Sequence, residues 1–269
     1  MKHFFSTSNF YLRKNPDQIL TWAAEKKFDG IEIFADVPGF YVDNFSDKIL
    51  KKYASKSPSL MYNIHSPIYG INIAAVNPGI LAESLRQILK IMEWARIIKI
   101  ENFVIHLGTL PAREKEVEEK SLKILNRSIT KILSAASKYK IRVIAENIGL
   151  SENYMDYDLN SLKTISKKYK MGICFDAGHG NISGNTDRIL TEFRDSIKSV
   201  HVSDNYEKAD EHNPVGEGTI QWTNIVKLIL KNNLPVVHEI HNRQTPGPST
   251  LKSRKNLERI LESVSRETI

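Results

Sequence analysis

Short apolar runs alternate with longer amphipathic stretches along the whole chain. The clearest amphipathic stretch is 78–99, where Leu81, Leu85 and Ile88 recur at intervals of three and four, as on one face of a helix. The apolar runs are too short for helices and indicate strands. Strands are expected at 3–8, 30–35, 60–65, 101–106, 141–146, 172–176, 197–201 and 235–240, and helices at 16–27, 46–56, 78–99, 114–139, 160–169, 187–193, 222–232 and 249–265.

This alternation of strands and helices predicts the fold class. Strands that are apolar on both faces are typical of a parallel sheet covered by helices. Eight strand–helix units in a domain of about 250 residues favour a single (β/α)8 TIM barrel. We therefore expect one domain over residues 1–269, with a doubly wound sheet as the alternative. No linker and no repeat of fixed period interrupts the pattern.

The charge balance leaves the partner class open. The net charge is +7, but no block of like charges gathers the basic residues, so a lysine-rich solvated surface explains the excess. Cys174 is the only cysteine, which rules out an intrachain disulfide. The N-terminus lacks the apolar core of a signal peptide, and no window is apolar enough to span a membrane. We expect a soluble cytoplasmic protein with no membrane partner; the oligomeric state is not indicated.

The expected strand ends carry metal-binding chemistry. In a TIM barrel these ends meet at one mouth, where active sites lie. The residues there are Glu32, His65, His106, Glu146, Asp176 with His179 three positions later, His201 and Glu239. The loop 201–218 adds Asp210 and His212 and closes with Gly-Glu-Gly. Imidazoles and carboxylates gathered on irregular backbone suit a divalent metal, and buried carboxylates need a cation beside them.

Other residues at the expected mouth have two interpretations each. Tyr69 could stack on a sugar or base, or simply pack its loop. Glu32 could contact substrate or be a hydrogen-bonded structural residue. Arg243 follows the last strand, where barrels often hold phosphate, so it could bind a phosphorylated substrate or lie free on the surface. His238 should point toward the helices because it alternates with Glu239. Cys174 is expected in the core.

Several segments together resemble a known family. They are Asn-Ile-His-Ser-Pro at 63–67, Val-Ile-His-Leu-Gly at 104–108, Ala-Glu-Asn at 145–147, Cys-Phe-Asp-Ala-Gly-His at 174–179, Val-His-Val-Ser-Asp at 200–204, the stretch 210–218 and His-Glu-Ile at 238–240. The chain resembles the xylose-isomerase-like TIM-barrel superfamily over nearly its whole length. That superfamily includes sugar and sugar-phosphate isomerases and epimerases, and endonuclease IV-type nucleases that act on abasic DNA.

The two branches of the superfamily imply different ligand sets. The epimerase branch implies one divalent ion held by Glu146, Asp176, His201 and Glu239, with His179 as a substrate contact. The nuclease branch implies three zinc ions and nine ligands: His65, His106, Glu146, Asp176, His179, His201, Asp210, His212 and Glu239. Because all nine positions are filled, we expect two or three ions per chain, with zinc or manganese as the metal.

The segments around these ligands depart from the nuclease pattern. Nucleases of this type usually have Thr-Cys where Ala177-Gly178 stands, and a large aromatic residue near the position of Asn181. The expected mouth loops also carry few basic residues, among them Arg13, Lys14 and Arg243. These departures count against DNA as the substrate.

The resemblance therefore implies a sugar or sugar-phosphate isomerase or epimerase as the first functional hypothesis. It would act through an enediolate, with Glu146 and Glu239 as the catalytic base and acid and a small sugar as partner. The alternative is a zinc-dependent phosphodiesterase that incises abasic DNA. A third hypothesis is a barrel that binds a metal or ligand without turnover.

Overall fold

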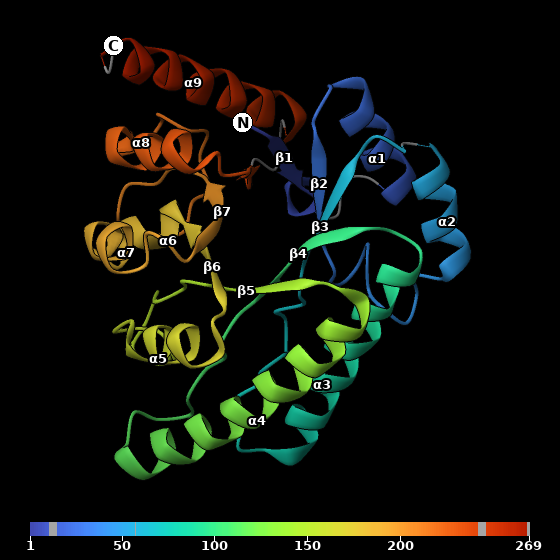
Figure 1. Ribbon diagram of the computed structural model, residues 1–269, viewed down its shortest axis with the longest axis vertical. Helices are drawn as coiled ribbons and strands as arrows, with labels where there is room; N and C mark the ends of the chain where they lie inside the picture. Colours follow the sequence, from blue (N-terminus) through green and yellow to red (C-terminus); the bar gives the residue numbers. More distant parts are fainter. Residues whose placement is uncertain (11–14, 57, 242–245, 268–269) are drawn as a thin grey trace.

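Eight parallel strands close into a barrel in the order in which they occur along the chain (Figure 1). The computed structural model describes residues 1–10, 15–56, 58–241 and 246–267. The strands are β1 (His3–Ser6), β2 (Gly30–Phe34), β3 (Met61–His65), β4 (Ile100–Ile105), β5 (Arg142–Glu146), β6 (Gly172–Asp176), β7 (Ile197–Val202) and β8 (Val236–His238). Since β8 pairs back onto β1, the (β/α)8 prediction is confirmed and the open doubly wound sheet is excluded.

Helices surround the strands on the outside (Figure 1). They are α1 (Pro16–Glu25), α2 (Asp47–Lys56), α3 (Pro78–Met92), α4 (Lys115–Tyr139), α5 (Asn160–Tyr169), α6 (Ala177–Ile182), α7 (Thr186–Glu192), α8 (Trp222–Asn232) and α9 (Pro246–Glu267), with 3-10 turns η1 (Thr7–Phe10) and η2 (Glu93–Arg96). Local signals fix several starts. Asn15 accepts a hydrogen bond from Gln18 N while the Gln18 side chain caps the Asn15 amide, so α1 begins with a complete capping box.

Several boundaries and one helix differ from the sequence prediction. The first strand ends at Ser6 rather than residue 8, because the chain turns into η1. The helix expected over 78–99 ends at Met92 and tightens into η2. Helix α6 was expected to be loop, since two glycines in Ala177–Ile182 weaken its helix signal. Asp176 starts this helix by accepting a hydrogen bond from His179 N at 2.7 Å.

The core has two parts because strand side chains alternate between the helices and the barrel interior. Outward residues such as Phe5, Ile31 and Ile33 join the large cluster between strands and helices. Each fully buried side chain of this size contributes about 1.5–3 kcal/mol. Inside the barrel, Val104, Ile144 and Cys174 form a separate apolar cluster, which confirms Cys174 as a core residue.

The carboxyl ends of the strands form the mouth of the barrel, above that inner cluster. No helix within the described ranges is both long and apolar enough to cross a membrane.

Candidate metal centre

A cavity of about 660 Å³ opens at the carboxyl ends of the strands. Seven of the nine expected ligands lie in its wall: His65, His106, Glu146, His179, Asp210, His212 and Glu239. Asp176 and His201 are fully buried and contact these residues. The fold therefore brings all nine residues to one place, as the strand-end pattern predicted.

The nine residues form three groups that could each hold an ion. One group is His65, His106 and Glu146; the second is His179, Asp210 and His212; the third is Glu146, Asp176, His201 and Glu239. Within each group the potential ligand atoms lie within 4.8 Å of one another. Glu146 belongs to two groups, so one carboxylate could bridge two ions.

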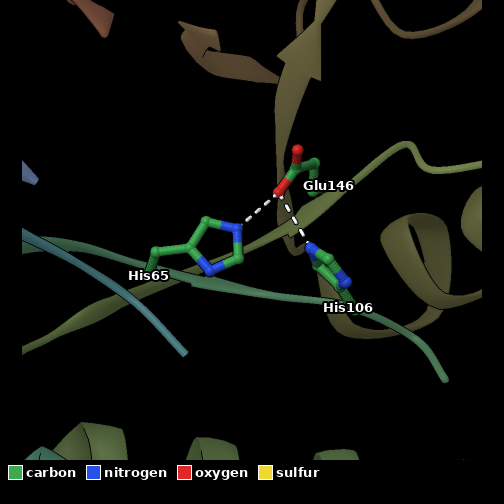
Figure 2. Close-up of side chains that lie close together, drawn as sticks. All are labelled: His65, His106 and Glu146. Carbon is green, nitrogen blue, oxygen red and sulfur yellow. Dashed lines mark hydrogen bonds and ion pairs between the residues drawn. The ribbon is translucent and has the colours of Figure 1, made fainter. Parts of the chain in front are cut away.

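The first group meets at one oxygen of Glu146 (Figure 2). His65 Nε2 lies 2.9 Å from Glu146 Oε2, and His106 Nε2 lies 3.2 Å from the same atom. The other His65 nitrogen, Nδ1, donates to the carbonyl oxygen of Ser66 at 2.8 Å. Because a carbonyl can only accept, Nδ1 carries a proton and Nε2 is the nitrogen available to a metal.

The second group repeats this arrangement around Asp210. His212 Nε2 and His179 Nε2 lie 2.9 Å and 3.3 Å from Asp210 Oδ2. Their Nδ1 atoms donate to the backbone carbonyls of Glu239 and Asn147, at 2.9 Å and 3.1 Å. Both imidazoles are therefore held in the tautomer that points Nε2 into the cavity.

The third group contains buried atoms without hydrogen-bond partners. His201 Nδ1 lies 3.1 Å from Glu239 Oε2, 3.4 Å from Glu146 Oε1 and 3.7 Å from Asp176 Oδ2. None of these contacts with His201 has hydrogen-bond alignment, and Asp176 Oδ2 also has no donor. Buried polar atoms are normally satisfied. Orphaned nitrogen and oxygen atoms that converge on one point fit a divalent ion, which imidazole and carboxylate ligands would bind.

The electrostatics of the site support the same fit. Burial alone would raise the pKa of Glu146, but the charge of His201 and several imidazole hydrogen bonds hold it well below its usual range. Burial would lower the pKa of His65 and His212, but the hydrogen bonds to Glu146 and Asp210 and nearby carboxylates raise each to about 9. Protons on the imidazoles thus balance the buried carboxylates. A divalent cation would supply that positive charge and release those protons.

One buried carboxylate shapes the loop that carries Asp210 and His212. Asp204 Oδ2 accepts from Trp222 Nε1 and Gly216 N at 2.9 Å and 2.8 Å. Its Oδ1 accepts from the amides of Asn205 and Ile220 at 3.0 Å and 3.2 Å. A Cβ at Gly218 would lie 2.3 Å from Asp204 Oδ1, which explains the second glycine of the Gly-Glu-Gly turn. Asp204 ends the Val-His-Val-Ser-Asp segment at 200–204, and nothing in the sequence alone indicates this role.

The remaining predicted residues occupy different places. Tyr69 lines the cavity with 56% of its surface exposed and packs edge-on against Phe34. Glu32 is fully buried beside His201 and is not among the residues that line the cavity. Of its two interpretations, this position favours the structural residue over the substrate contact. Arg243 lies outside the described residues. His238 faces helix α9 and bonds Ser253 Oγ through Nδ1, as the alternation predicted.

Ser8 and His241 line the cavity but are not among the predicted ligand and substrate-binding residues. Ser8 donates from Oγ to Glu239 Oε1 at 3.1 Å, and its hydroxyl also contacts His241 Nε2 at 3.1 Å. The His241 ring stacks on His212 with the centroids 3.8 Å apart. The sequence indicates His241 only through its place two residues after Glu239, from which it could reach the site, and Ser8 only through its place at the end of the expected first strand.

Comparisons with known proteins agree with the barrel fold. A family model described as xylose isomerase-like TIM barrel matches residues 20–263. An uncharacterised protein of Methanocaldococcus jannaschii is 26% identical over 208 residues, covering 75% of this chain and 70% of its own. A protein named "probable endonuclease 4" of Carboxydothermus hydrogenoformans is 25% identical over 264 residues, covering 89% of this chain and 90% of its own.

Solved structures share the fold over the full chain. A D-tagatose 3-epimerase-like protein superposes with a TM-score of 0.86 at 24% identity, covering 100% of both chains. The IOLI protein, solved with a bound zinc atom, superposes with a TM-score of 0.78 at 14% identity, covering 98% of this chain and 99% of its own.

Proposed function

Because the chain belongs to the xylose isomerase-like TIM-barrel family, we propose that it is a divalent-metal-dependent isomerase or epimerase of a small sugar or sugar phosphate. The arrangement of Glu146 and Glu239 carries this proposal. Glu146 ends β5, Glu239 follows β8, and both carboxylates reach within 3.4 Å of the same nitrogen of His201. Two carboxylates from separate strands thus approach one point in the floor of the cavity.

The third group, Glu146, Asp176, His201 and Glu239, would hold the ion used in the reaction. When bound, a divalent ion polarises the oxygens of a hydroxy-carbonyl substrate and makes the carbon-bound proton between them more acidic. The protein supplies the proton transfers. The pKa of Glu239 is lowered, because the close contact with His201 and its charge outweigh burial, so Glu239 is ionised at neutral pH.

Glu146 and Glu239 would act as a base and acid pair. One ionised carboxylate would accept the carbon-bound proton. The opposite carboxyl, after taking up a proton from solvent, would donate that proton to the substrate, so that one proton leaves the substrate and one returns. Ser8 donates to Glu239 Oε1, while Oε2 faces His201 Nδ1 in the third ligand group. Returning the proton to the opposite face of the same carbon would give an epimer; returning it to the neighbouring carbon would give an isomer.

The cavity wall favours a small sugar. Its volume falls within the range of about 300–1,000 Å³ that is typical of small-molecule sites. Phe34, Tyr69 and Tyr154 supply aromatic surfaces on one side, against which the C–H faces of a sugar can pack. The described residues of the wall include no lysine or arginine to pair with a phosphate. The structural neighbours that are sugar epimerases support the same class.

One observation favours a second candidate, a metal-dependent phosphodiesterase that acts on abasic DNA. The three ligand groups, with Glu146 shared between two of them, could hold three ions. The probable endonuclease 4 of Carboxydothermus hydrogenoformans matches along most of both chains. A nuclease would also need basic residues along the DNA backbone, and Arg13, Lys14 and Arg243 lie outside the described residues.

The experiment that separates the candidates uses protein loaded with zinc or manganese. A panel of ketoses is incubated with it in deuterated water, and an abasic duplex is incubated in parallel. We expect deuterium at the carbon next to the carbonyl of at least one sugar, with Glu146→Gln and Glu239→Gln both inactive. Efficient strand cleavage that Glu146→Gln abolishes, with no deuterium uptake by any sugar, would replace the first candidate by the second.

A further inference from the structure

Glu32 is an acidic side chain in the barrel interior whose position has no ordinary explanation. It lies in the middle of β2 with none of its surface exposed. Neither carboxylate oxygen has a hydrogen-bond donor among the described residues. An ionised carboxylate without a partner is strongly unfavourable in a protein interior. Some neighbouring group must therefore compensate its charge.

The only close charged neighbour that the described contacts give to Glu32 is His201. Glu32 Oε1 lies 2.9 Å from His201 Nε2, and both side chains are fully buried. The opposite ring nitrogen, Nδ1, faces Glu146, Asp176 and Glu239. The imidazole thus lies between Glu32 on one side and the third ligand group on the other. The distance between Glu32 Oε1 and His201 Nε2 is that of an ion pair, but the two atoms are not aligned as in a hydrogen bond.

His201 differs from three other imidazoles of the centre. In His65, His179 and His212 the nitrogen opposite the one that faces the carboxylate of its own ligand group donates to a backbone carbonyl; in His179 this second nitrogen also lies 3.4 Å from Glu146 Oε1. At His201 a carboxyl side chain, that of Glu32, takes the place of the carbonyl. The nitrogen that faces the ligand group is also different, because it is Nδ1 in His201 and Nε2 in the other three.

We propose that Glu32 is a positioning residue that holds His201 with its proton on Nε2 and leaves Nδ1 free to bind the ion of the third group. A carboxylate partner fixes the tautomer of a metal-binding imidazole and makes its other nitrogen a stronger donor. The proposal concerns the metal centre alone and does not depend on which substrate is used. It replaces the interpretation of Glu32 as a substrate contact.

The test is the affinity of the purified protein for zinc in the variant Glu32→Gln. This change keeps the volume of the side chain and removes its charge. Each ion is titrated against a chromophoric chelator, and the visible spectrum of the cobalt-loaded protein is recorded. We expect one ion to bind about 10–100-fold more weakly, as is usual when the partner of a metal-binding histidine is lost, with a changed cobalt spectrum and the other ions unaffected.

Asp36→Asn is the matched control. Asp36 is also a buried carboxylate, placed two residues after β2, but its oxygens accept from the amides of Val37, Ile68 and Tyr69. We expect this variant to keep the wild-type affinity for every ion. Wild-type affinities in Glu32→Gln, or the same loss in both variants, would overturn the proposal.

A measurement on the unaltered protein covers the case in which Glu32→Gln does not fold. Nitrogen-15 spectra of the histidine rings in the zinc-loaded protein report which nitrogen carries the metal and which the proton. We expect His201 to be metal-bound at Nδ1 and protonated at Nε2. Metal at Nε2, or no proton there, would refute the role of Glu32. Neither test uses a sugar or DNA, so the outcome stays separate from that of the proposed reaction.

Discussion

Replacing Asp204 by asparagine should destabilise the protein through two specific hydrogen bonds. The carboxylate accepts hydrogen bonds from four donors, two on each oxygen. In Asp204→Asn the amide oxygen can still accept from Asn205 and Ile220. The new NH2 group cannot accept from Gly216 N or Trp222 Nε1. The buried Trp222 donor left without an acceptor costs about 1–3 kcal/mol, and the lost hydrogen bond at the exposed Gly216 costs about 0.5–1.5 kcal/mol, so we expect a loss of roughly 2–4 kcal/mol.

The assay is urea unfolding of the metal-free protein, followed by fluorescence and circular dichroism. For a chain of this size the loss corresponds to a fall in Tm of roughly 5–15 °C. Trp222→Phe removes one of the two orphaned donors, so the double variant should be less destabilised than the sum of the two single variants. Since this loop carries Asp210 and His212, zinc binding at the second group should weaken as well. A loss below about 1 kcal/mol, or strict additivity, would refute this account of the loop.

The other predictions concern metal content, catalysis and pH. Elemental analysis after reconstitution should find at least two transition-metal ions per chain; one or none would contradict the grouping of the ligands. Glu146→Gln and Glu239→Gln should each lower the rate at least about 100-fold, while His238→Asn, whose side chain faces α9, should have nearly wild-type activity; equal activity in all three would place the chemistry elsewhere. Burial lowers the pKa of His3 from 6.5 to about 4, and burial also lowers that of His238, to which His3 Nδ1 is bonded. The unfolded chain then binds more protons, so stability contributed by this pair is present above pH 6.5 and falls as the pH drops toward 4. Urea midpoints of the metal-free protein between pH 8 and 5 should show a smaller decline in His238→Asn than in wild type, and parallel curves would contradict this.

The fold could be predicted because the apolar strands and amphipathic helices follow the two periods that backbone geometry imposes. The nine residues that meet at the cavity could be found for a related reason. Each lies at a strand end or in the loop after one, and a parallel barrel brings those ends together. Helix α6 could not be predicted, because a contact from Asp176 rather than helix propensity starts it.

The depth at which a side chain lies inside the barrel also could not be predicted from the sequence. Alternation places Glu32 inside the barrel, but its height relative to His201 depends on the stagger of β2 against the other strands. That stagger is set by the whole closed sheet. Ser8 was missed for a similar reason, since its hydroxyl acquires a role only where β1 lies beside β8 and Glu239.

The backbone anchors of His65, His179 and His212 bear on how this centre can change by mutation. A carbonyl oxygen is present whatever side chain its residue carries. Replacing Ser66, for example, leaves the acceptor for His65 Nδ1 in place. The residues around these three imidazoles can therefore change by mutation without loss of the tautomers. The cavity can be reshaped for new substrates in the same way. His201 lacks this protection, because its partner is the side chain of Glu32, which a single mutation can remove.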